Sequence, residues 1–403
     1  MTILSTRPAR PGHTTSSLRA PGLDWLLVLA TLALVTMGTL LVWSATSTRA
    51  DLTGGDPNAY LRKQLVNVAI GLVLMVAVLA TDHRWVRILA PLAYLASVAG
   101  LVMVLVAGST VNGSRSWLQV GGMSIQPSEL AKLAVVIGMA LVVAERTERR
   151  WGRRVGSLEV VAMLVIAGVP AVLILMQPDL GTMLVLSATV FGVLAVAGAG
   201  RWWLGGLTLA AVVGAVAAVS MGVLKPYQVD RFLAFTNPGL DPRGAGYNTE
   251  QARIAVGNGG LFGQGLFDGS QTRSGFVPEQ HTDFVFTVAG EELGLVGATV
   301  LVGLFALLLW RALRIALRAE DLFGRVAAAG VACWFGFQIF QNIGMCLGIM
   351  PVTGVPLPLV SYGGTSMFAS LTAVGLLLNV HLRTQGRAGS GVVVRSRFAR
   401  SRF

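Results

Sequence analysis

The chain of 403 residues is 54% hydrophobic and only 12% charged, and it contains several uninterrupted apolar runs of about 20 residues. A run of that length crosses a bilayer as a helix, so the composition excludes a soluble globular protein. In a soluble protein the net charge of +12 would suggest a nucleic-acid partner. Here the basic residues lie between the apolar runs and in the two tails, so we interpret them as topology signals and expect no nucleic-acid partner.

The apolar runs, taken in chain order, predict an all-α integral membrane protein with about ten transmembrane helices. Residues 1–23 are basic and rich in Pro, Ser and Thr, which predicts a disordered cytoplasmic tail. The membrane domain is expected to cover residues 24–383, followed by a basic cytoplasmic tail, 384–403. The expected spans are residues 24–45, 64–81, 86–107, 127–144, 158–176, 180–199, 203–223, 283–309, 326–347 and 366–382.

The distribution of basic residues predicts the orientation of these spans. With the N-terminus inside, 21 Lys and Arg residues lie on the cytoplasmic side and 10 lie outside, as the positive-inside rule requires. Both termini are then cytoplasmic. Three non-apolar stretches face outward, namely residues 108–126, a large loop at 224–282, and 348–365. The chemistry is therefore expected at the outer face of the membrane.

Charged residues inside an expected span are candidates for function because they are costly in a bilayer. Glu129 and Lys132 follow Pro127 and Ser128, which suit a helix start, and they lie three residues apart on one helix face. The alternative interpretation is an ion pair that only stabilises the helix end.

The stretch GNGGLFGQGL (257–266) resembles a phosphate loop only superficially. It has no GK[ST] sequence, and Phe262 breaks the GxGxxG register. We expect these glycines to permit tight turns and a close backbone approach, while backbone donors to a pyrophosphate remain an alternative.

The stretch PEQHTDFVF (278–286) places Asp283 at the head of an apolar span, directly after His281 and Thr282. Taken alone, an acid at this position is typical of a helix cap. Glu291 and Glu292, further along the same span, are interpreted as structural.

Prolines and glycines interrupt residues 341–367, QNIGMCLGIMPVTGVPLPLVSYGGTSM, so this stretch cannot form a straight helix. Irregular backbone at membrane depth is tolerated where it lines a cavity. Asn342 and Ser361 are predicted polar walls of that cavity. The sequence shows no zinc-binding motif and no Ser/His/Asp arrangement.

Four stretches together resemble the SEDS family (shape, elongation, division, sporulation), in the family's order and over nearly the whole chain. They are NGSRSWL with QPSELAK, DPRGAGYNTEQARIAVGNGGLFGQGL, PEQHTDFVF with GEELGLVG, and NIGMCLGIMPVTGVPLPLVSYGGTS. VPEQHTDF and QNIGM with PVTGVPLP look more like the elongation branch, RodA, than the division branch, FtsW. One departure is GGTS, where the family usually has GGSS.

The resemblance implies a ten-span peptidoglycan glycosyltransferase that polymerises lipid II at the outer face of the bacterial cytoplasmic membrane. It implies a class B penicillin-binding protein as the transpeptidase partner, alongside other cell-elongation machinery and membrane lipids. Asp283 corresponds to the family's catalytic acid, and Glu129 and Lys132 to the acid and lysine of its QPSExxK motif. A divalent cation, Mg or Mn, is a candidate cofactor with no ligands assigned. The predicted substrate-binding residues are Lys132, Glu129, Trp117, Arg115, Arg231, His281, Gln251, Asn342 and Ser361.

Two other classes of function remain open from the sequence. Ten spans with buried polar residues also describe a carrier that flips lipid II, although we find no internal repeat. A scaffold without catalysis would tolerate substitution of Asp283. Within the family, a division-type role is the alternative to elongation.

Overall fold

The computed structural model describes residues 22–111, 114–120, 123–149, 155–222, 229, 231, 235 and 244–398. Within these residues, ten helices are long and apolar enough to cross a membrane, which confirms the predicted fold class. Each overlaps one expected span, but two extend well beyond it: α12 ends at Arg318 and α14 at Phe398. Most of the N-terminal segment expected to be disordered lies outside the described residues.

The elements follow one another along the chain with short connections. The ten spanning helices are α1 (Trp25–Ser47), α3 (Ala59–Ala80), α4 (His83–Ala107), α5 (Pro127–Arg149), α6 (Ser157–Met176), α7 (Leu180–Ala197), α8 (Arg201–Ser220), α12 (Val285–Arg318), α13 (Leu322–Cys346) and α14 (Gly364–Phe398). The short elements are α2 (Ala50–Thr53), α10 (Ala245–Asn258), α11 (Ser270–Ser274), β1 (Ser109–Val111), β2 (Ser114–Val120) and β3 (Met123–Ile125).

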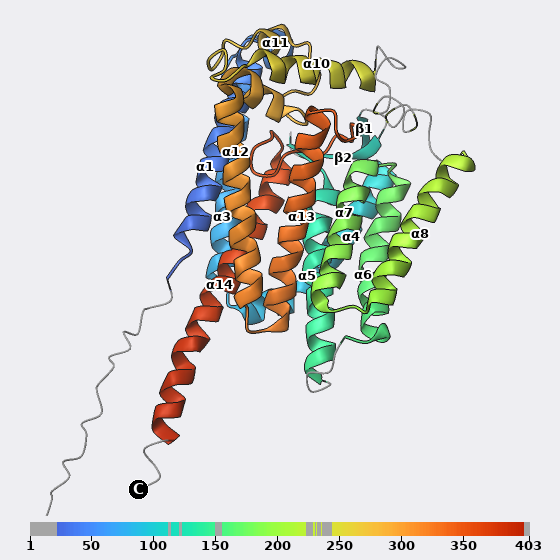
Figure 1. The fold of residues 1–403 in the computed structure, drawn as a ribbon, viewed down its shortest axis with the longest axis vertical. Coiled ribbons are helices and arrows are strands. Elements are labelled where there is room, and N and C mark those ends of the chain that lie inside the picture. Colours follow the sequence, from blue (N-terminus) through green and yellow to red (C-terminus); the bar gives the residue numbers. More distant parts are fainter. Residues whose placement is uncertain are drawn as a thin grey trace, which may run out of the picture.

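The spanning helices form one bundle, with α5, α13 and α14 mostly buried in it (Figure 1). Helix α8 has no buried residue and diverges from the bundle at its C-terminal end (Figure 1). Among the neighbouring pairs are α3 with α14, α12 with α13, α7 with α13, and α1 with α12. Small residues allow close approach, since a Cβ on Gly375 of α14 would lie 2.6 Å from the carbonyl oxygen of Met75 in α3.

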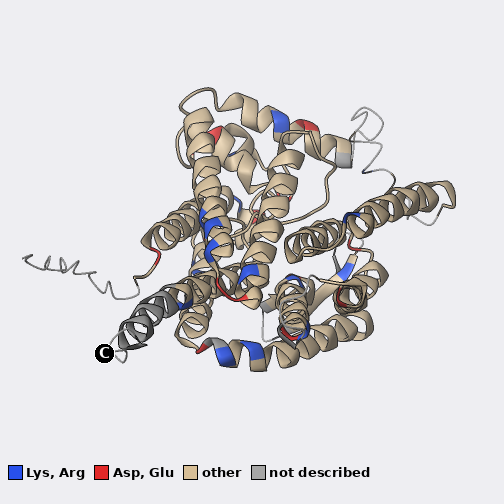
Figure 2. Cartoon of the chain, turned by 60° about the horizontal axis from the view of Figure 1, so that its bottom comes forward, with Lys and Arg blue, Asp and Glu red and all other residues tan. Residues whose placement is uncertain are grey.

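Charged residues avoid the middle of the helices. In Figure 2 the basic residues lie mainly near helix ends and turns, and long helical stretches carry no charge. At the end of the bundle opposite α10 and α11, Asp24 at the start of α1 is buried and pairs with Arg311 near the end of α12. This ion pair joins the first and eighth spanning helices.

The short elements gather at one end of the bundle, the upper end in Figure 1. The strands pair antiparallel in the order β1-β2-β3, with Thr110 opposite Arg115 and Gln119 opposite Ser124. This small sheet was not expected from the sequence. Helix α10 packs against α12, and α11 lies next to both.

The glycine-rich segment 257–266 packs into a break in α12. Gly294 leaves the helical conformation (φ 64°, ψ −165°), and Gln264 and Gly265 donate to the freed carbonyls of Glu291 and Glu292 at 3.0 Å each. A Cβ on Gly263 would overlap the carbonyl oxygen of Glu292. The close backbone approach expected of these glycines is therefore made to α12, and the amides of Gln264 and Gly265 are occupied.

Glu291 and Glu292 hold this junction together, in agreement with their structural interpretation. Glu291 accepts hydrogen bonds from the amides of Gln271 (2.6 Å) and Thr272 (2.9 Å) at the start of α11. Glu292 accepts from the hydroxyl of Ser44 in α1 at 2.6 Å. The two carboxylates thus attach the outer loop to the membrane helices.

Candidate active site

A cavity of about 160 Å³ lies at the end of the bundle that carries the sheet and α10. Its walls come from β2, the turn between α6 and α7, the turn before α12, and the irregular segment between α13 and α14. This confirms the expectation that the irregular segment lines a cavity. The described residues lining it are Ser114, Ser116, Trp117, Gln126, Pro178, Asp179, Arg231, Glu279, Thr282, Asp283, Thr353, Gly354, Pro356, Tyr362, Gly363, Thr365 and Ser366.

The backbone around Asp283 is held in a fixed turn. The carbonyl of Glu279 accepts from the amides of Asp283 (3.0 Å) and Phe284 (3.2 Å). On the other side, the side-chain amide of Asn342 in α13 donates to the carbonyls of Asp283 (2.7 Å) and Val355 (2.8 Å). Asn342 thus stands behind the cavity wall and joins two of its segments.

The carboxylate of Asp283 does not cap α12. The N-cap of that helix is Phe284, and its cap position makes no side-chain hydrogen bond. Instead the half-buried carboxyl faces the cavity, where a Cβ on Gly354 would lie 3.2 Å from its Oδ2 atom. Glycine at position 354, with φ 70°, therefore leaves room beside the acid.

Burial raises the pKa of Asp283 to about 7, and the nearby carboxylates of Glu279, Asp179 and Glu129 raise it further, while Arg231 opposes them. A carboxyl with a pKa near neutrality is matched to proton transfer at physiological pH. Asp283 is thus suited chemically to act as a general base or acid.

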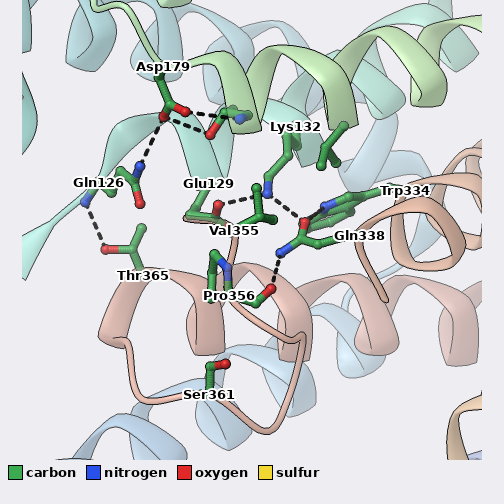
Figure 3. A network of polar contacts seen from close by, with 12 residues as sticks. Gln126, Glu129, Lys132, Asp179, Trp334, Gln338, Val355, Pro356, Ser361 and Thr365 are labelled. Carbon is green, nitrogen blue, oxygen red and sulfur yellow. Dashed lines mark hydrogen bonds and ion pairs between the residues drawn. The ribbon is translucent and has the colours of Figure 1, made fainter. Parts of the chain in front are cut away.

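Glu129 and Lys132 form a buried ion pair behind this cavity, with an Nζ to Oε1 distance of 2.7 Å (Figure 3). Lys132 also donates to the Oε1 atom of Gln338 at 2.7 Å and lies 5.2 Å from the ring centre of Trp334. Gln338 in turn donates to the carbonyl of Pro356, a cavity-lining residue, at 2.8 Å. The pair supports the wall, and Lys132 is not among the residues that line the cavity.

A second polar network fixes the opposite wall (Figure 3). Asp179 caps α7 by accepting from the amide of Thr182 at 2.9 Å, and it also accepts from the side-chain amide of Gln126 at 3.2 Å. The backbone amide of Gln126 donates to the hydroxyl of Thr365 in α14 at 3.0 Å. Sequence reasoning missed Asp179 and Gln126 as site residues. Their signal was polar residues flanking the outer ends of spans.

The remaining predicted site residues divide into two groups. Trp117 and Arg231 line the cavity. His281, Arg115, Gln251 and Ser361 do not: Arg115 donates to the carbonyls of Val106 and Gly108, Ser361 accepts from the amide of Leu357, and Gln251 lies on α10.

His281 is 7% exposed, and burial lowers its pKa. A neutral imidazole at this position does not supply the positive charge that the sequence suggested. Among the described residues, no group of three or more His, Cys, Asp or Glu side chains could hold a metal ion, so the structure names no ligands for a divalent cation.

Comparisons with known proteins agree with the arrangement of these motifs. The family model of FtsW, RodA and SpoVE, described as "Cell cycle protein", matches residues 24–386. The stage V sporulation protein E of Bacillus subtilis is 38% identical, and the match covers 89% of this chain and 96% of the relative. The peptidoglycan glycosyltransferase MrdB of Escherichia coli is 36% identical, covering 89% of this chain and 93% of that protein. The probable peptidoglycan glycosyltransferase FtsW of Allochromatium vinosum is 39% identical over 94% of both chains.

Solved structures share the fold. A chain from a peptidoglycan synthase complex, described as coordinating polymerisation and crosslinking, has a TM-score of 0.74 and 36% identity, covering 89% of this chain and 98% of its own. The rod shape determining protein RodA of Thermus thermophilus has a TM-score of 0.65 and 32% identity, covering 89% and 97%. The chain therefore belongs to the FtsW/RodA/SpoVE family of cell cycle proteins, the SEDS family.

Proposed function

We propose that this protein is a peptidoglycan glycosyltransferase that polymerises lipid II and releases undecaprenyl pyrophosphate, with Asp283 as its general base. The observation that carries the proposal is the position of Asp283, whose pKa is about 7, in a cavity built by the motifs that the family shares. Relatives named as peptidoglycan glycosyltransferases support the same activity.

The reaction requires one proton acceptor and one region of positive charge. Asp283 takes the proton from a sugar hydroxyl of the acceptor as that oxygen bonds to the anomeric carbon of the donor. The bond to the lipid pyrophosphate breaks with inversion, and the leaving group departs with the bonding electron pair. Arg231 is the cation that lines the cavity, where it can stabilise the developing negative charge. Lys132 remains a proposed contributor from behind the wall.

The place of the cavity suits an amphiphilic substrate. It lies at one end of the spanning helices, so a lipid tail can stay in the bilayer while the sugars reach Asp283. The positive-inside distribution supports placing this end outside the bacterial cytoplasmic membrane and both termini inside.

A transpeptidase partner is part of the proposal. The similar chain that belongs to a peptidoglycan synthase complex supports a class B penicillin-binding protein as that partner. Within the family we propose the elongation role, on the strength of VPEQHTDF and PVTGVPLP. Relatives from sporulation, division and rod-shape groups match at 32–39% identity, so identity alone does not select the role. Depletion in a rod-shaped host tests it, because loss of elongation gives round cells and loss of division gives filaments.

The decisive experiment measures glycan chains formed from labelled lipid II by purified protein, with and without a class B partner and with Mg²⁺, Mn²⁺ or a chelator. Asp283→Asn should lose at least about 100-fold in rate, because a general base contributes that much or more. The control is Asp268→Asn, which makes the same chemical change at an exposed acid paired with Arg273 outside the cavity. Full activity of Asp283→Asn contradicts the assignment. Transport of lipid II by vesicles that form no chains would favour the flippase.

A further inference from the structure

Three aromatic rings from distant parts of the chain meet beside the Asp283 turn. Tyr60, at the start of α3, lies edge-on to His281, with ring centres 5.0 Å apart and an interplanar angle of 83°. It also contacts Tyr362, with centres 4.9 Å apart, and His281 and Tyr362 are 5.6 Å apart. We call these three residues the aromatic cluster.

The cluster is connected directly to the cavity. His281 lies two residues before Asp283, and Tyr362 lines the cavity with it. The amide of Tyr362 donates to the carbonyl of His281 at 2.9 Å, so the turn before α12 and the segment before α14 are joined by backbone as well as by rings. Tyr60 contacts both segments at this junction.

Helix α3 gives Tyr60 a firm base. It packs along α14, where a Cβ on Gly71 would lie 2.5 Å from the side chain of Leu371. Close packing of this kind transmits small displacements, because a packed interior has little free volume. A ring held on α3 therefore limits where His281, and the turn that follows it, can move.

The Asp283 turn is thus held from two sides. Asn342 in α13 fixes the Asp283 carbonyl on one side, and the aromatic cluster fixes His281 on the other. We propose that Tyr60 is a positioning residue for the glycosyl transfer, holding the turn so that the Asp283 carboxylate meets the acceptor hydroxyl. This inference rests on the proposed function of Asp283 and assigns a role to a residue outside the family motifs.

The contacts of Tyr60 within the cluster are ring contacts, so Tyr60→Phe preserves them and Tyr60→Ala removes them. Displacement of a reacting group by about 1 Å can cost about 100-fold in rate. We expect Tyr60→Ala to lower kcat for polymerisation by about 10- to 100-fold with KM for lipid II changed less than about threefold, and Tyr60→Phe to stay within about twofold of wild type.

The matched control is Tyr94→Ala, which truncates another half-buried tyrosine on a spanning helix. Tyr94 lies on α4, donates to the carbonyl of Ile166 at 2.9 Å and does not line the cavity. It should leave kcat within about twofold. If Tyr94→Ala lowers kcat as much as Tyr60→Ala does, or if Tyr60→Ala raises KM alone, the positioning role is wrong.

Hydrogen exchange provides a readout that does not depend on catalysis. In Tyr60→Ala the amides of Thr282, Asp283 and Phe284 should exchange faster, and in Tyr60→Phe and Tyr94→Ala they should exchange as in wild type. Unchanged exchange together with unchanged kcat overturns the inference. If Tyr60→Ala does not fold, Tyr60→Leu keeps side-chain volume without the ring and is judged by the same two measurements. An active Asp283→Asn would defeat the proposed function, while the exchange data would still report on the turn.

Discussion

Asp283 gains its reactivity from surroundings that no single motif contains. The half-buried carboxyl faces a cavity that also holds the acids Glu279 and Asp179, and these raise its pKa in the same direction as burial does. The positive charge of Arg231 opposes the shift. The balance leaves a base that is ionised in about half of the molecules near pH 7.

The pH dependence of polymerisation should follow this pKa. Because only the ionised carboxylate accepts a proton, the rate should rise as the pH increases through about 7 and fall below it. Glu279→Gln removes a negative charge that raises the pKa of Asp283, so the acid limb of the pH–rate profile should move to lower pH. Glu250→Gln, on exposed α10 outside the cavity, should leave the limb in place. An unmoved limb in Glu279→Gln would contradict this account.

The same shift has a consequence for stability. A carboxyl whose pKa is raised on folding stabilises the fold while it is protonated, and this contribution is lost as the pH rises from its ordinary value of 3.8 through about 7. Asn cannot ionise. Asp283→Asn should therefore unfold at the same temperature as wild type, or a higher one, above pH 7. A lower unfolding temperature would show that the carboxylate makes stabilising contacts instead.

The Glu129–Lys132 pair gives a prediction about stability and wall geometry together. Both side chains are at most 2% exposed, so Lys132→Met leaves a buried carboxylate without its partner, which costs about 3–5 kcal/mol. Adding Glu129→Gln removes that charge and should restore most of the thermal stability. If the double variant is stable yet inactive, the pair acts on the reaction. If it is stable and active, the pair is only structural.

At the scale of elements, the outer loop is attached to the bundle through the break in α12. Gly260 and Gly263 both have positive φ, but only a Cβ on Gly263 would overlap the α12 backbone, since nothing lies within 4 Å of the Cβ position of Gly260. The two glycines separate backbone strain from close approach.

Gly263→Ala should therefore lower the unfolding temperature more than Gly260→Ala does. Both substitutions incur about 1–2 kcal/mol for a left-handed residue, and Gly263→Ala adds about 1–3 kcal/mol for displacing packed backbone. Thermal unfolding of the purified protein in detergent measures the difference. Equal effects would mean that the glycine-rich segment does not depend on its contact with α12.

Hydropathy predicted the ten spans because a bilayer requires about 20 apolar residues for each helix, a constraint written locally in the sequence. It did not predict the β1–β3 sheet, whose strands are short and whose pairing depends on non-local contacts. Helical spacing correctly placed Glu129 and Lys132 on one face. It could not show that Gln338 and Trp334, over 200 residues later, cover Lys132.

The same limit applies to the candidate site. The motifs identified Asp283, Trp117 and Arg231, which line the cavity. The sequence gave no sign that His281 is packed between Tyr60 and Tyr362, because Tyr60 precedes it by more than 200 positions. Its expected positive charge failed for that reason: burial is a property of the assembled bundle.

At the scale of the whole molecule, orientation in the membrane decides whether the cavity can meet its substrate. The turn at Gly54–Gly55 after α2 lies at the cavity end, and the turn between α12 and α13, which contains Glu320, lies at the opposite end (Figure 1). The positive-inside distribution places the first outside and the second in the cytoplasm.

Single cysteines at these turns test that orientation. In a background with Cys333→Ala and Cys346→Ala, a membrane-impermeant maleimide added to intact spheroplasts should label Gly55→Cys and not Glu320→Cys. Both positions are exposed, so both should react once the membrane is permeabilised, which controls for accessibility. The opposite labelling pattern would place Asp283 in the cytoplasm. Polymerisation there would then have to precede transport of the glycan, and the proposed role at the outer face would be wrong.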